Sequence, residues 1–394
     1  MAASELARAA ELINRAPGLI ATRPTPDAAA ALLAEARAVS TGDPAVEARL
    51  LIAEAYLGSD TDPHTRELAE RAAALARRVG SPLTESAALD ELTAVHLAHG
   101  EIRAALTTSL RRIDLLQPVR VTAASGLEMA DAFDMAAESA IAAGDFATAR
   151  DMAEHSRDLP FHREEGHLAT SRLIVVTTLA GDWGETVELA KQFREGWERA
   201  GRPRAGNLSR GAYAAATVHG LRGEDGLREL WLRIVDDLET PGRPLSLIHV
   251  GEFFDALLFL HRGLPERATD ELQTPPELFQ EWHNGLWRPW YAALWAEAAV
   301  LTGRSDAESR IRQARWSTRD NPIAASIVDR AAAMSRASLD REELIRVAAV
   351  LESAGCRYQW ARTLVIVGGK HRLRGEAALA AMSATPMVWR PESD

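Results

Sequence analysis

Histidine is the most chemically versatile side chain in this sequence, because an imidazole can bind a metal ion or transfer a proton. His162 and His167 stand five residues apart in HREEGH, which places them on different faces of a helix and does not match the zinc-protease motif HExxH. His96 and His99 are three residues apart and share a helical face, but two histidines supply at most half of a zinc site. The sequence therefore predicts no metal site.

A nucleophile or a phosphate-binding loop would need a patterned neighbourhood, which the remaining reactive groups lack. Cys356 is the single cysteine, and no histidine or asparagine is arranged with it in a known pattern. The basic stretch GGKHRLRG (368–375) lacks the GxxxxGK[ST] spacing of a phosphate loop and is typical of a turn between helices. Neither GxGxxG nor GxSxG occurs. We therefore expect no catalytic residues, no enzymatic activity and no cofactor.

The segments around these side chains belong to a repeated sequence motif. In each copy, a glycine separates two segments whose apolar residues have helical spacing. LAGDWGETVELA (179–190) matches AAGDFATARDMA (142–153) and LAHGEIRAAL (97–106). Looser copies continue the pattern in both directions, at intervals of 37 to 44 residues. The repeat glycines are Gly58, Gly100, Gly144, Gly181, Gly223, Gly263 and Gly303.

Each copy is predicted to be a helix, a tight turn and a second helix. Glycine suits the left-handed position just past a helix end, where a Cβ would be strained. An acidic residue such as Asp145 or Asp182 then favours the start of the next helix. Trp183 takes the place of Phe146 and Ile102 on the first turn of that helix. We therefore interpret Trp183 as a structural residue that packs back across the turn.

Repeated helix pairs predict an all-α fold, namely a superhelical solenoid of antiparallel pairs similar to tetratricopeptide repeats. The expected organisation is an N-terminal helical cap and linker (1–42), the repeat superhelix (43–387) and a tail (388–394). The longest apolar runs are far shorter than the roughly 20 residues of a membrane span. No apolar signal-peptide core occurs near the N-terminus.

Charge and cysteine content narrow the classes of function. The net charge of -11 gives a surface that repels nucleic acid. A single cysteine excludes an internal disulfide and fits a reducing compartment. We therefore expect a cytoplasmic protein that binds neither DNA nor membranes, while the sequence leaves its oligomeric state open.

The predicted binding surface is the concave side of the superhelix, which is lined by the first helix of each pair. Positions thirteen, ten and six residues before the repeat glycines share one face of these helices. The later part of this face is aromatic with isolated charges, and concave surfaces of that kind bind small molecules or peptides. The predicted ligand-binding residues are Arg210, Tyr213, Phe253, Trp290 and Glu297.

Two alternatives to this small-molecule site remain. The earlier part of the same face is acidic and suits a basic peptide or helix of a protein partner. The residues of this alternative partner-binding site are Asp90, Asp131, Asp134 and Glu138. Aromatic residues in degenerate repeats are also typical of ordinary helix packing.

The C-terminal part of the sequence resembles a known family. The segments that carry the resemblance are GLWRPWYAALWAEAAVL (285–301), DNPIAASIVDRAAA (320–333) and GCRYQWARTLVIVGGKHRLRGEAALAAMSATPM (355–387). They are similar to the helical-repeat region of large actinobacterial LuxR-type regulators, in which an ATPase module precedes tetratricopeptide-like repeats. The resemblance covers roughly residues 80–387.

The resemblance implies an all-helical sensor arm, similar to the repeat domain that binds the sugar inducer in the maltose-operon activator. No phosphate loop precedes the repeats and no helix-turn-helix follows them, so we expect an excised sensor domain or a stand-alone relative. The expected function is therefore ligand or partner sensing, without catalysis, for a bacterial transcriptional regulator. The alternative is a stand-alone scaffold for protein–protein interaction.

Overall fold

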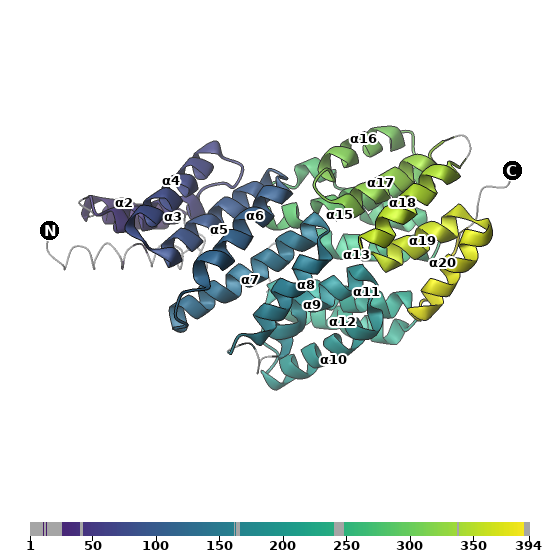
Figure 1. Cartoon of the computed structure of the whole chain (residues 1–394), viewed down its shortest axis with the longest axis horizontal. Coiled ribbons are helices and arrows are strands. Elements are labelled where there is room, and N and C mark those ends of the chain that lie inside the picture. Colours follow the sequence, from purple (N-terminus) through teal and green to yellow (C-terminus); the bar gives the residue numbers. More distant parts are fainter. Residues whose placement is uncertain are drawn as a thin grey trace. The chain divides into compact units, whose positions relative to one another are not determined.

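The computed structural model describes residues 11, 13, 26–39, 42–160, 162, 166–239, 248–336 and 339–389. These residues form 19 α-helices, two short 3-10 helices and no strand (Figure 1). The predicted all-α class is therefore confirmed. Most of the expected cap (1–42), and residues 390–394 of the expected tail, lie outside the described residues. None of the helices in the described part is long and apolar enough to cross a membrane.

Helices that follow one another in the chain pack side by side in pairs such as α3 with α4 and α9 with α10. The first helices are α2 (Pro26–Val39), α3 (Pro44–Leu57), α4 (Pro63–Val79), α5 (Pro82–Ala98), α6 (Ile102–Leu116) and α7 (Ala123–Ala143). The central ones are α8 (Phe146–Asp158), α9 (Gly166–Ala180), α10 (Trp183–Arg199), η1 (Gly206–Leu208), α11 (Ser209–Leu221), α12 (Asp225–Leu238), α13 (Ile248–His261), α14 (Pro265–Glu271) and η2 (Pro276–Leu278). The last are α15 (Trp282–Leu301), α16 (Ala307–Ser317), α17 (Pro322–Met334), α18 (Arg341–Ser353), α19 (Arg357–Val367) and α20 (Gly369–Ala381).

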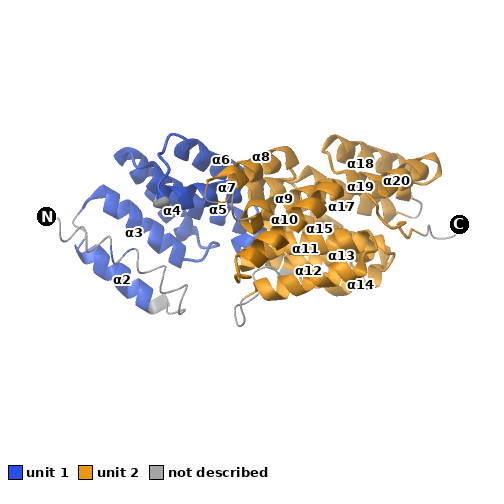
Figure 2. Ribbon diagram, turned by 90° about the horizontal axis from the view of Figure 1, so that it is seen from below, with its two compact units in different colours: residues 1–136, 280–285 blue, residues 137–279, 286–394 orange. Residues whose placement is uncertain are grey.

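The chain divides into two compact units (Figure 2). Unit 1 comprises residues 1–136 and 280–285, and unit 2 comprises residues 137–279 and 286–394. The short segment 280–285 belongs to unit 1 because it packs against α5, so closely that a Cβ on Gly285 would lie 2.2 Å from the carbonyl oxygen of Leu97. The predicted repeat region therefore contributes to two units.

The seven repeat glycines all lie in turns between helices. Six of them have the predicted left-handed backbone, with φ between 62° and 91°. Gly58 differs, since its φ of −74° is one that any residue can adopt. Gly355, between α18 and α19, has a φ of 70° and marks a further copy of the turn that the glycine spacing did not predict.

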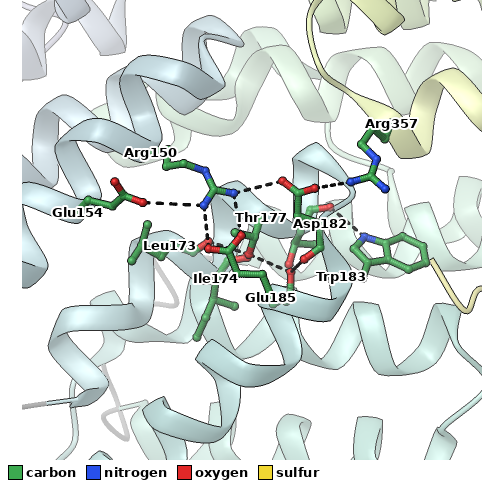
Figure 3. A network of polar contacts seen from close by, with 11 residues as sticks. Arg150, Glu154, Leu173, Ile174, Thr177, Asp182, Trp183, Glu185 and Arg357 are labelled. Atoms are coloured by element: carbon green, nitrogen blue, oxygen red, sulfur yellow. Dashed lines mark hydrogen bonds and ion pairs between the residues drawn. The ribbon is translucent and has the colours of Figure 1, made fainter. Parts of the chain in front are cut away.

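The turn at Gly181 shows how such a copy is built (Figure 3). Trp183 opens α10, is 1% exposed and donates a hydrogen bond from its indole to the carbonyl of Thr178 at 3.1 Å. Its predicted structural role is therefore confirmed. Asp182 accepts hydrogen bonds from Arg150 of α8 at 3.1 Å and from Arg357 of α19 at 2.6 Å, so this turn is tied to a helix far along the chain.

Four helix C-termini of unit 2 receive hydrogen bonds from residues up to 179 positions later in the chain. Carbonyl groups at a helix end have no partner within the helix and need a donor from elsewhere. The donor and acceptor pairs are Asn321 with Ala142, Cys356 with Leu179, Thr385 with Leu221, and Val388 with His261. The later part of unit 2 therefore caps the ends of α7, α9, α11 and α13.

Candidate binding site

The aromatic residues of the predicted ligand site lie inside unit 2. Phe253 on α13 and Trp290 on α15 are each 1% exposed, and their ring centroids are 6.3 Å apart. The indole of Trp290 donates to the carbonyl of Ile141 at 2.9 Å, and its ring stacks on Phe146 with the centroids 6.0 Å apart. The two predicted residues do meet, but they fill the core and do not form the walls of an open surface.

Glu297 lies in a separate buried network of charges. Its carboxylate accepts hydrogen bonds from Arg330 at 2.7 Å and Arg362 at 3.1 Å, and all three side chains are at most 1% exposed. Arg330 also donates to the side chain of Gln359 at 2.9 Å. Burial raises the pKa of Glu297, but the two guanidinium groups outweigh that effect and the net pKa is lowered. The network joins α15, α17 and α19.

Arg210 and Tyr213 of α11 occupy a third environment. Arg210 is 8% exposed and forms an ion pair with Glu138 of α7, whose carboxylate also accepts from Arg172 of α9 at 3.2 Å. The pocket beside them leaves only about 10 Å³ for the centre of a water molecule, roughly the room that one water needs. Tyr213 is half-buried, and burial raises its pKa. The five predicted ligand residues therefore do not form a single open site.

Two residues of the alternative acidic site meet in unit 1. Arg112 of α6 is fully buried and donates hydrogen bonds to Asp90, to Glu128 at 3.0 Å and to Asp131 at 2.7 Å. Three carboxylates therefore share one cation, and the cluster has a negative balance. Burial raises the pKa of Asp90 to about 7 against the opposing effect of Arg112.

The other two residues of the acidic site have different surroundings. Asp134 is half-buried on α7. Glu138 belongs to unit 2, where Arg172 and Arg210 neutralise it as described above. A site in unit 1 can therefore use Asp90 and Asp131 without Glu138.

Unit 1 has an open groove next to this cluster. Its volume is about 540 Å³, which is within the range of pockets that hold small ligands. Most of its walls are apolar, and the side chain of Tyr56 is 49% exposed. The lining residues of α3 and α5 are Arg49, Ile52, Ala53, Tyr56, Leu83, Thr84, Ala87 and Glu91, and Ile13 adds to them. We call this feature the unit 1 groove.

Among the described residues that line the unit 1 groove, Glu91 is the acidic one and Arg49 is the basic one. The carboxylate of Glu91 is half-buried and takes part in no hydrogen bond or ion pair within the described part of the chain. Burial, with smaller contributions from the neighbouring charges of Asp90 and Asp60, raises the pKa of Glu91 to about 8 against the pull of Arg112. The groove therefore contains a carboxyl group that forms no ion pair within the described part of the chain and is mostly protonated at pH 7.

Glu91 was not among the predicted site residues, although the repeat pattern contains its position. It stands nine residues before Gly100, and Arg49 of the same groove stands nine residues before Gly58. The predicted face used positions thirteen, ten and six, of which Ala87, at thirteen before Gly100, and Ile52, at six before Gly58, line the groove. Glu91 follows Ala87 by four residues and therefore lies on the same face of the helix, so the predicted face was near the groove but its list omitted position nine.

Cys356 and His96, which were considered above as possible reactive residues, make contacts that stabilise the fold. Cys356 is 1% exposed, and burial raises the pKa of its thiol to about 12, so the thiol stays protonated at neutral pH. His96 bonds to Glu101 across the turn at Gly100. Within the described residues, no group of three or more histidine, cysteine, aspartate or glutamate side chains is arranged to hold a metal ion.

Comparison with known proteins does not show what the groove binds. A scan against models of protein families and a search of curated proteins both found no match. The unit 1 groove is the candidate binding site on its geometry and charge.

Proposed function

We propose that this chain is a non-catalytic helical-repeat protein that binds a partner protein through the unit 1 groove, with its helix pairs following a superhelical course. The observation that carries the proposal is the difference between the buried aromatic residues of the predicted ligand site and the open groove of unit 1. Phe253 and Trp290 are enclosed in a core, whereas the groove of about 540 Å³ exposes Tyr56 and the apolar walls around it. Paired repeat helices bind peptide segments and helices along faces of this kind.

The resemblance to LuxR-type regulators supports a role for this binding as the sensing arm of a cytoplasmic transcriptional regulator. The net charge of -11 argues against DNA as the occupant of the groove. A small effector beside Arg210 receives less support, because the pocket there has room for about one water. The protein-interaction alternative is therefore the better supported of the two functions.

The proposed function can be tested with a photo-reactive phenylalanine analogue at position 56 in the native cell. Trp316 of α16 is the matched control, because it is an aromatic residue of unit 2 with 54% exposure, close to the 49% of Tyr56. We expect the analogue at position 56 to crosslink one protein species. The same species should not be crosslinked by the analogue at position 316. Equal capture at both positions, or capture at neither, would contradict the proposal.

A further inference from the structure

We propose that the occupant of the unit 1 groove is a basic peptide segment, in which a lysine or arginine side chain pairs with Glu91 and a neighbouring apolar side chain packs against Ile52 and Tyr56. This inference rests on the proposed function and adds the chemistry of the partner.

The charges around Glu91 call for a cation. The nearby acids are Asp60, which follows α3, Asp90 on the same helix and Asp131 on α7. Arg112 is the cation among them, but Asp90, Glu128 and Asp131 already use its guanidinium group. A desolvated carboxylate is costly unless it is paired with a counterion, and without one Glu91 keeps its proton up to about pH 8. A basic side chain entering the groove would supply that counterion.

The apolar walls of the groove also favour an occupant that has apolar groups beside its charge. Ile52, Ala53, Leu83 and Ala87 offer apolar contact on both α3 and α5, and the ring of Tyr56 is half exposed beside them. A lysine or arginine side chain carries an apolar stem that packs on such walls while its charged end reaches a carboxylate. A free metal ion or a small polyamine would leave most of this apolar surface uncovered. A peptide with adjacent basic and apolar residues matches both features.

Binding of a basic side chain should release a proton. The pKa of Glu91 is raised to about 8 in the free protein, so the carboxyl group is mostly protonated at pH 6 and pH 7. A bound ammonium group favours the ionised form. Affinity for a lysine peptide should therefore rise by up to about tenfold per pH unit below pH 8 and level off above it.

Other titratable groups around Glu91 contribute to this pH dependence. Asp90, with a pKa of about 7, adds to the slope below pH 7. The remaining charged groups that face Glu91 or line the same groove are Arg49, Asp60, Arg112 and Asp131, and His99 and Glu281 face Asp60 in turn. The steep part of the profile above pH 7 belongs to Glu91.

The experiment uses three peptide pools, which are randomised except for a central lysine, norleucine or glutamate, and the whole chain as bait. We expect enrichment from the lysine pool only. The best lysine peptide should bind at pH 8 at least about tenfold more tightly than its norleucine version, as a charge-assisted hydrogen bond would give. Glu91→Gln should remove this preference and flatten the pH profile above pH 7. The matched control is Glu70→Gln on the exposed surface of α4, which should change neither.

The outcomes separate this inference from the proposed function. Equal binding of lysine and norleucine peptides, or a lysine preference that survives in Glu91→Gln, would show that the groove docks peptides without the proposed charge pairing. Complete competition by spermidine alone would identify a free amine as the occupant and overturn the peptide. Failure of all three pools, together with no crosslink at position 56, would overturn both proposals. Circular dichroism at each pH confirms that the variants are folded.

Discussion

The negative charge of Glu91 lowers the stability of the folded protein. A half-buried carboxylate among Asp60, Asp90 and Asp131 raises the free energy of the folded state whenever it is ionised. Carboxyl groups with strongly shifted pKa values are concentrated at functional sites. The energetic cost of Glu91 is therefore itself an argument that a ligand uses it.

Replacing Glu91 with Gln should stabilise the chain at neutral and alkaline pH. The pKa of this carboxyl group rises from 4.5 to about 8 on folding, so the folded protein holds the proton more tightly than the unfolded chain. The stability of the parent should therefore fall, relative to the variant, as pH rises from about 4.5 to 8, and stay level above that. Denaturant unfolding at several pH values measures this difference. Parallel curves for the two proteins would contradict the environment described for Glu91.

Replacing Glu297 with Gln should destabilise the folded protein, in contrast to Glu91→Gln. Glu297 is completely buried between Arg330 and Arg362, so Glu297→Gln leaves two guanidinium groups without an anion. Removing one partner of a buried ion pair costs about 3–5 kcal/mol of stability. Chemical denaturation at pH 7 tests this value. A loss below about 1 kcal/mol would mean that water reaches the network.

The sequence placed pairs of predicted residues together but did not show which of them line an open surface, for a physical reason. Asp90 and Asp131 meet as their positions on the helices required, although their shared partner Arg112 lies on a second helix that the chosen face did not include. Phe253 and Trp290 also meet, but periodicity alone cannot distinguish a face that lines a groove from one that later helices cover. The lack of an ion-pair partner, which makes Glu91 distinctive, depends on helix rotation and on residues distant in the sequence.

At the scale of elements, local rules predicted the helix pairs and their turns. The left-handed turn depends only on the glycine and its immediate neighbours, so the spacing of Gly100 to Gly303 was sufficient to place it. The capping of these turns by Asn321, Cys356 and Thr385 was not predicted, because the donors come from distant parts of the chain. Such contacts differ from those of an ideal solenoid, in which each repeat contacts only its neighbours.

Two glycine substitutions can measure the contact between the turn at Gly181 and α19. Gly181 has a φ of +91°, and a Cβ there would lie 2.9 Å from the backbone nitrogen of Tyr358. Gly201 has a φ of +83° with no atom within 4 Å of its Cβ position, and so it is the matched control. Both changes to alanine should cost about 1–2 kcal/mol for the left-handed backbone.

Gly181→Ala should cost about 1–3 kcal/mol more than the control, because α19 must move away from the added methyl group. Thermal or denaturant unfolding of both variants gives the difference. Equal losses at the two positions would show that α19 does not approach this turn as closely as described.

At the scale of the whole molecule, the tryptophans provide a probe of one unit. Every tryptophan except Trp282 lies in unit 2. Unit 1 contains the unpaired carboxylate of Glu91, whereas unit 2 has the distant caps, so we expect unit 1 to unfold first. Far-UV circular dichroism should therefore begin to change at a lower denaturant concentration than tryptophan fluorescence. Coincident transitions would indicate that the two units unfold as one.

The distant caps of unit 2 also affect its biosynthesis. The carbonyl of Ala142 receives its donor from Asn321, which is made 179 residues later. At about 5–20 residues per second, the ribosome needs roughly 10–40 s to cover that interval. Each of the helices α7, α9 and α11 has its own such interval, during which water must satisfy the carbonyl groups at its end. The helix pairs of unit 2 are therefore synthesised well before the donors that complete the unit.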